Sequence, residues 1–177
     1  MVEYYFDMET TGTDFDTDEI ITIQWQMLDR NIGVQAGELK ILKRWDFLEK
    51  EIIETFLPNL RCRPFDFIFI GKNLLFDFCL LNQRMKHYGL GELDLRCLNE
   101  RAILDIKPIL VLMNDGTFID YDKVLPKTNP LTNKEIPQLY RDKKYPEIIG
   151  YIEDEAKDFI EAYRKLKNKM PSLRNLL

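Results

Sequence analysis

The chain has 177 residues, of which 45% are hydrophobic and 12% aromatic, so it is long and apolar enough for one packed domain with a sizeable core. This composition excludes an intrinsically disordered chain, and the lack of any run of about 18 uncharged apolar residues predicts no membrane-spanning helix. The formal net charge of −5 argues against a high-affinity, nonspecific binder of duplex DNA, because such proteins are usually basic.

The chain contains the three cysteines Cys62, Cys79 and Cys97, and no two of them form a Cys-x-x-Cys pair. An odd number without that spacing predicts free thiols in a reducing compartment, and not a disulfide framework or a zinc site. The first residues lack the basic-then-apolar pattern of a secretion signal. We therefore expect a cytoplasmic protein.

The first predicted element is a strand over residues 3–8, because residues 4–6 are all aromatic. Asp7 and Glu9 stand two residues apart and so share one face of that strand. Buried together, the two carboxylates would repel each other and lose hydration, a cost that a divalent cation with oxygen ligands would offset. The alternative is an edge strand with two solvated acids. Gly12 then permits a turn.

Two further strands are expected before any helix. Residues 18–28 alternate between an apolar face and a polar face, which predicts a half-buried strand. The expected apolar face carries Ile21, Ile23, Trp25 and Met27. Residues 38–45 also alternate, so the first three strands should form an antiparallel meander.

The middle of the chain predicts a helix, a strand and a second helix. Apolar residues recur at helical spacing up to residue 57, and Pro58 is expected to end the first helix. Residues 65–71 are almost wholly apolar, as in a strand covered on both faces. The next helix is closed by Gly89. Asp77 lies in its early turns, just beyond the end of the strand, where sites in α/β sheets are often found.

The last third of the chain predicts a loop and a long helix. Residues 102–113 fit a short strand or a helix, because Pro108 interrupts the apolar run. Residues 128–137 are rich in Pro, Asn and Thr and predict a long loop of the kind that often carries function. An amphipathic helix should run from Pro146 to about residue 168. We assign residues 1–169 to one domain and residues 170–177 to a C-terminal tail.

Three short motifs resemble those of one enzyme family. Residues 6–12, Phe-Asp-Met-Glu-Thr-Thr-Gly, resemble the first motif of the DEDD superfamily of 3′–5′ exonucleases, Asp-x-Glu followed by Thr-Gly. Residues 73–77, Asn-Leu-Leu-Phe-Asp, resemble the second motif, Asn-x-x-Phe-Asp. Residues 151–156 resemble the tyrosine form of the third motif, Tyr-x-x-x-Asp, with glutamate at the last acidic position. The stretch 139–155 is also similar to predicted exonucleases related to the proofreading domain of family B DNA polymerases.

The resemblance implies an α/β fold of the ribonuclease H-like type, with a mixed five-stranded sheet, an antiparallel three-strand meander and helices on both faces. It also implies two divalent cations, Mg²⁺ or Mn²⁺, that act on a phosphodiester bond by a two-metal mechanism. The implied metal ligands are Asp7, Glu9, Asp77 and Glu155.

The third motif leaves two acids as candidates for the last ligand. Glu155 is favoured because it lies four residues after Tyr151 on the same helix face, whereas Asp154 is the competing ligand. The hydroxyl of Tyr151 would position the attacking water, since a tyrosine of ordinary pKa near 10 is a poor base at neutral pH. The residues implied to contact the terminal nucleotide are Met8, Thr10, Thr11 and Asn73.

We therefore expect a metal-dependent 3′–5′ exonuclease that hydrolyses phosphodiester bonds at the 3′ ends of single-stranded DNA or RNA. The alternative is a catalytically weak or inactive module that binds nucleic acid or another partner on the same fold. The glutamate in place of aspartate at residue 155 favours this alternative, because Mg²⁺ is strict about its ligand geometry. No residue can be assigned to reading the 2′-hydroxyl, and no motif names a polymerase or other protein partner.

Overall fold

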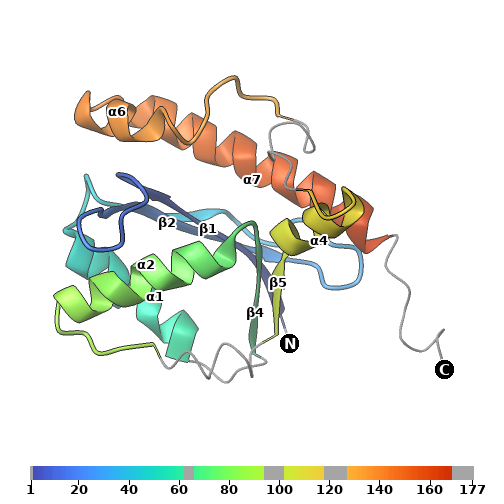
Figure 1. Ribbon diagram of the computed structural model, residues 1–177, viewed down its shortest axis with the longest axis horizontal. Coiled ribbons are helices and arrows are strands. Elements are labelled where there is room, and N and C mark those ends of the chain that lie inside the picture. The colour runs from blue at the N-terminus through green and yellow to red at the C-terminus, as the bar shows by residue number, and fades with distance from the viewer. Residues whose placement is uncertain (1, 62–65, 94–101, 118–126, 169–177) are drawn as a thin grey trace.

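The described strands form one mixed five-stranded sheet (Figure 1). The computed structural model describes residues 2–61, 66–93, 102–117 and 127–168. The strands are β1 (Val2–Thr10), β2 (Ile20–Leu28), β3 (Lys40–Lys43), β4 (Phe67–Gly71) and β5 (Ile103–Asp105). The helices are α1 (Glu49–Arg61), α2 (Leu74–His87), α4 (Ile106–Met113), α6 (Ile136–Arg141) and α7 (Tyr145–Lys167).

The strands lie in the order β3-β2-β1-β4-β5. β1 pairs with β2 and β2 with β3 in antiparallel register, whereas β4 runs parallel to β1 and β5 parallel to β4. Parallel neighbours need crossover connections, which the segments containing α1 and α2 supply. The predicted mixed sheet with its antiparallel meander is therefore confirmed.

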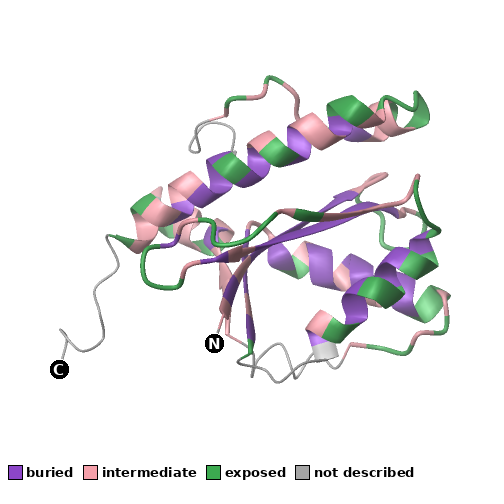
Figure 2. Cartoon of the chain, turned by 180° about the vertical axis from the view of Figure 1, so that it is seen from behind, coloured by how far each residue is buried: buried purple, intermediate pink, exposed green. Residues whose placement is uncertain are grey.

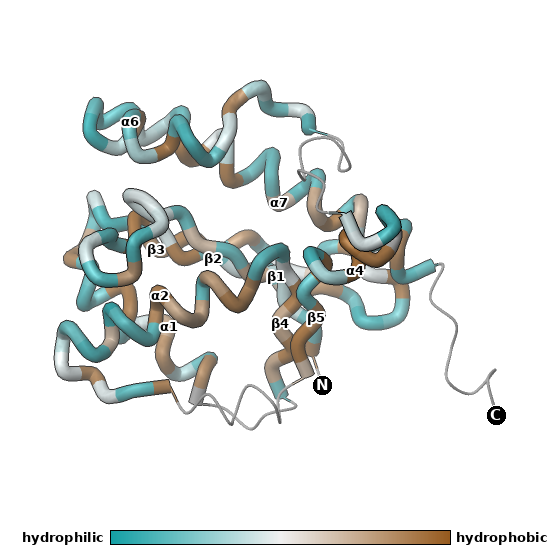
Figure 3. Tube along the Cα trace, viewed as in Figure 1, coloured by the Kyte–Doolittle hydropathy of each residue, from teal (hydrophilic) through white to brown (hydrophobic). Residues whose placement is uncertain are grey.

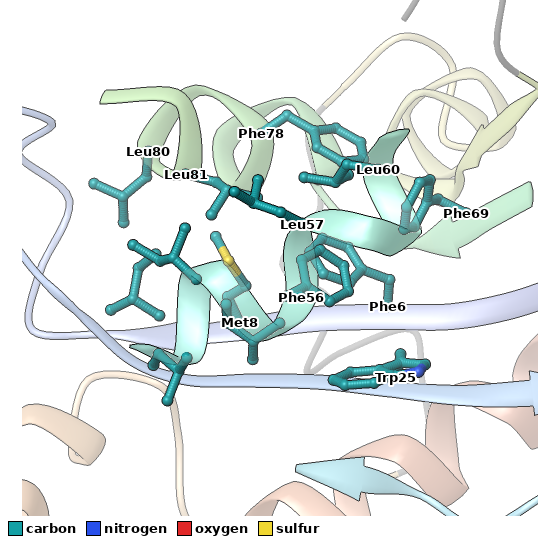
Figure 4. Close-up of a cluster of buried hydrophobic side chains, with 14 of the residues drawn as sticks. Phe6, Met8, Trp25, Phe56, Leu57, Leu60, Phe69, Phe78, Leu80 and Leu81 are labelled. Atoms are coloured by element: carbon teal, nitrogen blue, oxygen red, sulfur yellow. The ribbon is translucent and has the colours of Figure 1, made fainter. Parts of the chain in front are cut away.

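Helices cover both faces of the sheet: α1 and α2 lie on one face and α7 on the other (Figure 1). The layer under α1 and α2 is aromatic, and in it the ring of Phe6 stacks on that of Phe56 with 5.1 Å between centroids (Figure 4). On the opposite face, Tyr5 packs with Phe159 of α7. Successive residues of β1 alternate between these layers, so Asp7 shares the α7 face with Tyr5.

The prediction of a half-buried β2 was wrong, because helices on both faces leave almost every residue of this strand buried (Figure 2). The expected apolar face also breaks at its start. The register shifts between residues 9 and 10, where Thr22 pairs with Glu9 and Ile20 with Thr10. Ile21 is the extra residue in this bulge, and it packs with residues of α7 and not with Ile23.

Two helix predictions are corrected. Pro58 does not end α1, which continues to residue 61; Pro58 is exposed, and Leu60 extends the buried stripe beyond it. A short strand or a helix was predicted over residues 102–113, and both are present: the strand β5 is followed directly by the helix α4. Pro108 is tolerated there because it lies in the first turn of α4, where a backbone N–H has no helical partner. The predicted loop 128–137 holds until α6 begins at Ile136.

Hydrophobic residues are concentrated in α4 and around β4 and β5, and hydrophilic residues lie along much of α6 (Figure 3).

The predictions on membrane helices and cysteines can be compared with the described residues. No described helix combines the length and the apolar character needed to cross a membrane. Cys79 carries a free thiol. Cys62, Cys97 and the predicted tail 170–177 lie outside the described residues.

A buried ion pair joins the start of α1 to α2 and β2. The side chain of Glu49 has no exposed surface, and it accepts hydrogen bonds from both Nε (2.9 Å) and Nη2 (2.7 Å) of Arg84. It also accepts bonds from the backbone N–H of Ile20 (2.8 Å) and the hydroxyl of Tyr88 (2.8 Å). One carboxylate therefore holds three elements together on the face of the sheet opposite α7.

The substitution Glu49→Ala is expected to lower the free energy of unfolding by about 3–5 kcal/mol, because it leaves the charge of Arg84 buried without its partner. Urea unfolding followed by circular dichroism measures this loss. Glu54→Ala is the matched control: Glu54 forms an exposed pair with Lys50 at 3.9 Å. We expect that control to change stability by less than about 0.5 kcal/mol, and equal effects of the two substitutions would contradict the prediction.

Candidate active site

Four buried carboxylates from three elements converge beyond the carboxyl end of β4. Asp7 and Glu9 come from β1, Asp77 from the first turn of α2 and Glu155 from α7. Each of the four residues is at most 9% exposed. Carboxylate oxygens of Asp7, Glu9 and Glu155 all lie within 4.8 Å of one another. The structure thus brings together acids that are up to 148 residues apart in sequence, counted from Asp7 to Glu155.

The β4–α2 junction positions Asp77. Asn73 precedes the helix with φ of 62°, a left-handed conformation that asparagine tolerates better than most residues. Its backbone N–H donates to Asp105 at 2.8 Å, and its side-chain oxygen accepts a bond from Nζ of Lys107 at 2.7 Å. This turn directs α2 so that the buried Asp77 carboxylate points toward the acids of β1, and Asp77 lines the same cavity as they do.

Two polar side chains form hydrogen bonds with the carboxylate of Asp7. The Tyr5 hydroxyl donates to Oδ2 of Asp7 at 3.2 Å, and Nε2 of Gln24 donates to the same oxygen at 3.4 Å. Gln24 lies directly opposite Asp7 in the β1–β2 register and also accepts a bond from Thr22 at 2.9 Å. The alternating sequence pattern predicted that the polar face of β2 is exposed to solvent. This face is buried instead, and it contacts the acid cluster through Gln24.

Burial and mutual repulsion raise the pKa values of the clustered acids. The pKa of Asp7 rises from 3.8 to about 7, first because of burial and then because of the Glu155 carboxylate. Burial, followed by the charges of the neighbouring acids, also lifts the pKa values of Glu9 and Asp77 well above their ordinary range. The ammonium of Lys72 acts in the opposite direction on all three. The cluster is therefore short of positive charge.

Lys72 is a site residue that the sequence analysis missed. It follows Gly71, the last residue of β4, and its side chain is 12% exposed. Its Nζ forms an ion pair with Oε1 of Glu155. The only sequence signal was its place at the carboxyl end of a central strand, immediately before the Asn-x-x-Phe-Asp motif.

The two candidates for the third motif have different surroundings. Glu155 reaches the acids of β1, whereas Asp154 accepts a hydrogen bond from Nδ2 of Asn129 at 2.9 Å. Tyr151 is fully buried, and its hydroxyl donates to Oδ1 of Asn133 at 3.0 Å. Burial first, and then the carboxylates of Glu9 and Glu155, raise the pKa of Tyr151 above its ordinary value, so the hydroxyl stays protonated.

A cavity of about 440 Å³ opens above the acids. Its wall combines the acids of β1 and α2 with residues of the loop before α6. The sequence predicted this loop as one that often carries function, but it did not indicate which of its residues reach the site. The lining residues are Asp7, Met8, Glu9, Thr10, Gly12, Thr13, Lys72, Asn73, Phe76, Asp77, Asn133, Lys134 and Pro137.

Not all of the residues expected to contact a nucleotide line the cavity. Thr10 and Asn73 line the cavity. The Thr11 hydroxyl instead donates to Oδ1 of Asp18 at 2.8 Å and is not part of the lining. Met8 reaches the cavity wall, but its residue is only 6% exposed and belongs to the core beneath α1 (Figure 4).

The donor set fits a divalent cation. Oδ2 of Asp77 and Oε2 of Glu155 are buried and have no hydrogen-bond partner among the described residues. Buried carboxylate oxygens without a partner are costly, and hard oxygen ligands of this kind are what Mg²⁺ and Mn²⁺ prefer. The described acids could therefore hold such an ion, with Asp7, Glu9 and Glu155 contributing one ligand atom each.

No protein-family model matches the sequence, and no curated protein matches it. Solved structures do match. A moderately thermophilic exonuclease I from Methylocaldum szegediense aligns over 99% of this chain with 15% identity and a TM-score of 0.62. A zinc-bound complex of Escherichia coli exonuclease I with single-stranded DNA aligns over 99% with 11% identity and a TM-score of 0.58.

A complex of E. coli exonuclease I with a dT13 oligonucleotide aligns over 96% of this chain with 12% identity and a TM-score of 0.56. The chain spans 41% to 42% of the length of these three proteins. At such low identity the likeness concerns the fold. The chain therefore has the ribonuclease H-like α/β fold that exonuclease I also has.

Proposed function

We propose that this chain is a metal-dependent 3′–5′ exonuclease that hydrolyses phosphodiester bonds at the 3′ ends of single-stranded nucleic acid. One observation carries the proposal: four buried acids, two of them with an unpartnered oxygen, are clustered, and three of the four, Asp7, Glu9 and Asp77, line a cavity. Their positions correspond to the motifs that resemble the DEDD exonucleases, and the fold is that of exonuclease I.

In this proposal Asp7, Glu9, Asp77 and Glu155 hold the cations, Mg²⁺ or Mn²⁺. When bound, the cations supply Lewis-acid activation of a water and neutralise charge on the phosphate. Tyr151 orients that water through its hydroxyl and does not take its proton, because its raised pKa keeps it protonated. Asn133 in turn fixes the direction of the Tyr151 hydroxyl, to which it is bonded at 3.0 Å.

The cavity mouth supports a single strand as the substrate. The volume of about 440 Å³ falls in the usual range of ligand pockets, about 300–1,000 Å³. Lys134 is an exposed cation on its wall and is placed to contact a phosphate. Phe76 lines the cavity, and the ring of Phe15, a residue 40% exposed, lies 5.4 Å from that of Phe76. Such rings can stack on bases of any sequence. The single-stranded DNA bound to exonuclease I in two of the matched structures supports the same class of substrate.

The substitution Phe15→Ala is expected to weaken binding of single-stranded DNA about 5- to 150-fold, because base–aromatic stacking contributes about 1–3 kcal/mol per base. Fluorescence anisotropy with a labelled oligo-dT measures this loss, in an Asp7→Asn background so that the strand stays intact. The control is Phe47→Ala, since Phe47 is 55% exposed, whereas Phe15 contacts the ring of Phe76, which lines the cavity. Equal affinities for the two variants would show that Phe15 does not contact the strand.

A second candidate is a module that binds single strands and does not cleave them. The ion pair of Lys72 with Glu155 favours it, because a cation of the chain already occupies one acid of the proposed metal site. The two candidates are separated by an assay of 3′-end degradation with labelled single-stranded DNA and RNA, in Mg²⁺ and in Mn²⁺. Stepwise shortening from the 3′ end supports the enzyme, and the preferred strand identifies DNA or RNA. Strand binding without shortening in either metal supports the module.

A further inference from the structure

Lys72 is held firmly at the edge of the acid cluster. The preceding residue, Gly71, ends β4 in a space with no room for a side chain: an added Cβ would lie 2.5 Å from the backbone oxygen of Phe6 and 2.5 Å from Cδ2 of Leu74. The backbone at Gly71, directly before Lys72, is therefore packed against β1. From this position its ammonium pairs with Oε1 of Glu155, and only 12% of its side chain is exposed.

The same ammonium acts on the whole cluster and not on Glu155 alone. Asp7, Glu9 and Asp77 line the same cavity as Lys72, and its positive charge lowers the pKa of each of these three acids. Lys72 also lines the cavity, on the side where Asn73 and Asp77 enter. The positive charge of Lys72 therefore offsets part of the negative charge of the acids, as a bound cation would.

The charges of the cluster limit the number of divalent cations that it can bind. Four ionised carboxylates carry four negative charges, and the ammonium of Lys72 leaves a net charge of −3. One divalent cation reduces this to −1, whereas two would make the site positive. A second divalent cation would also have to take Oε1 of Glu155 from an ammonium that is already buried beside it.

We propose that Lys72 is a built-in counter-ion that takes the place of a second divalent cation while no nucleic acid is bound, so that the site then binds one ion only. The inference rests on the proposed function, because it concerns the metal site of that enzyme. The first ion uses Asp7, Glu9 and the unpartnered Oε2 of Glu155, while Lys72 stays paired with Oε1 of Glu155. Lys72 is a positioning residue in this account, since it acts through the carboxylates.

The test is titration of the full chain with Mn²⁺ by isothermal calorimetry, with no nucleic acid present. The wild type is expected to bind one Mn²⁺. The substitution Lys72→Met should allow a second Mn²⁺ to bind and should raise the affinity for the first at least about tenfold, because a repelling charge a few ångströms away is removed. The substitution Lys72→Arg keeps the charge and should behave as the wild type. Lys86→Met is the matched control: Lys86 lies on α2 but pairs with Glu92 at 3.2 Å, away from the cavity.

A double substitution keeps the inference testable if Lys72→Met alone fails to fold. Lys72→Met combined with Glu155→Gln removes both partners of the ion pair, so neither is left buried with an unpaired charge. Compared with Glu155→Gln alone, the double variant should gain less Mn²⁺ affinity than Lys72→Met gains in the wild type. An unchanged stoichiometry and affinity in Lys72→Met, or two Mn²⁺ bound by the wild type, would overturn the inference.

These results are independent of nuclease activity. A wild type that binds one Mn²⁺ but degrades no strand would contradict the proposed function and leave the role of Lys72 standing. A wild type that degrades strands while Lys72→Met binds Mn²⁺ as the wild type does would contradict the inference alone.

Discussion

The substitution Asp7→Asn is expected to reduce the rate of 3′-end hydrolysis by about 10³-fold or more, with little change in strand binding. The asparagine side chain keeps the shape of Asp7 but loses the charge that a divalent cation needs. Metal ions contribute several kcal/mol of transition-state stabilisation, and about 4 kcal/mol corresponds to a factor near 10³ in rate. Single-turnover degradation of a labelled single strand measures the loss, and anisotropy measures binding.

The same substitution is expected to stabilise the metal-free protein. Burial and Glu155 raise the pKa of Asp7 to about 7, so holding this carboxylate ionised at pH 8 costs free energy that the neutral amide does not. Opposite effects on activity and stability would identify Asp7 as a functional group that the fold holds at a cost. The control is Asp46→Asn, because Asp46 forms an exposed pair with Lys43 at 2.7 Å and should affect neither. An active Asp7→Asn protein would remove the basis of the proposed function.

The second large effect is a pH dependence of stability that a divalent cation removes. In EDTA, the free energy of unfolding should fall by about 4 kcal/mol as the pH rises from 3.8 to about 7, from the shift of Asp7 alone at 1.36 kcal/mol per pKa unit. The folded chain holds the proton of Asp7 over this range while the unfolded chain releases it. Stability is therefore highest below pH 3.8 for this group and is lost as the pH passes its folded pKa. The raised pKa values of Glu9 and Asp77 act in the same direction.

Urea unfolding at a series of pH values, with EDTA and with Mg²⁺ or Mn²⁺, measures this dependence. A cation at 100 times its dissociation constant should restore about 2.7 kcal/mol at neutral pH, since it binds only the folded chain. In EDTA the Asp7→Asn variant should lose less stability over the same pH range than the wild type. A wild-type profile that rises with pH in EDTA, or that the cation leaves unchanged, would contradict the presence of a strained acid cluster at this place.

Much of the fold could be predicted from local patterns. Aromatic and alternating residues marked β1, β2 and β3, the apolar run 65–71 marked β4, and the 3.6-residue stripe marked α7. Short spacings were informative in the same way: residues two apart on a strand share a face, which placed Asp7 beside Glu9. The predictions that failed depended on neighbours that a local pattern does not contain. Pro58 is tolerated in α1 because the buried stripe continues past it, and the polar face of β2 is buried because α7 covers it.

The sequence by itself determined the fold class and the candidate acids, because strand and helix periodicity and the three motifs are properties of neighbouring residues. Only the tertiary structure decided what surrounds those acids. Lys72 reaches Glu155 across 83 positions of the chain, and the Tyr151 hydroxyl bonds to Asn133 of a loop. Coulomb energy and desolvation depend on distances through space and on burial, so the charge balance of the cluster arises only when the sheet brings β1, α2 and α7 to one edge.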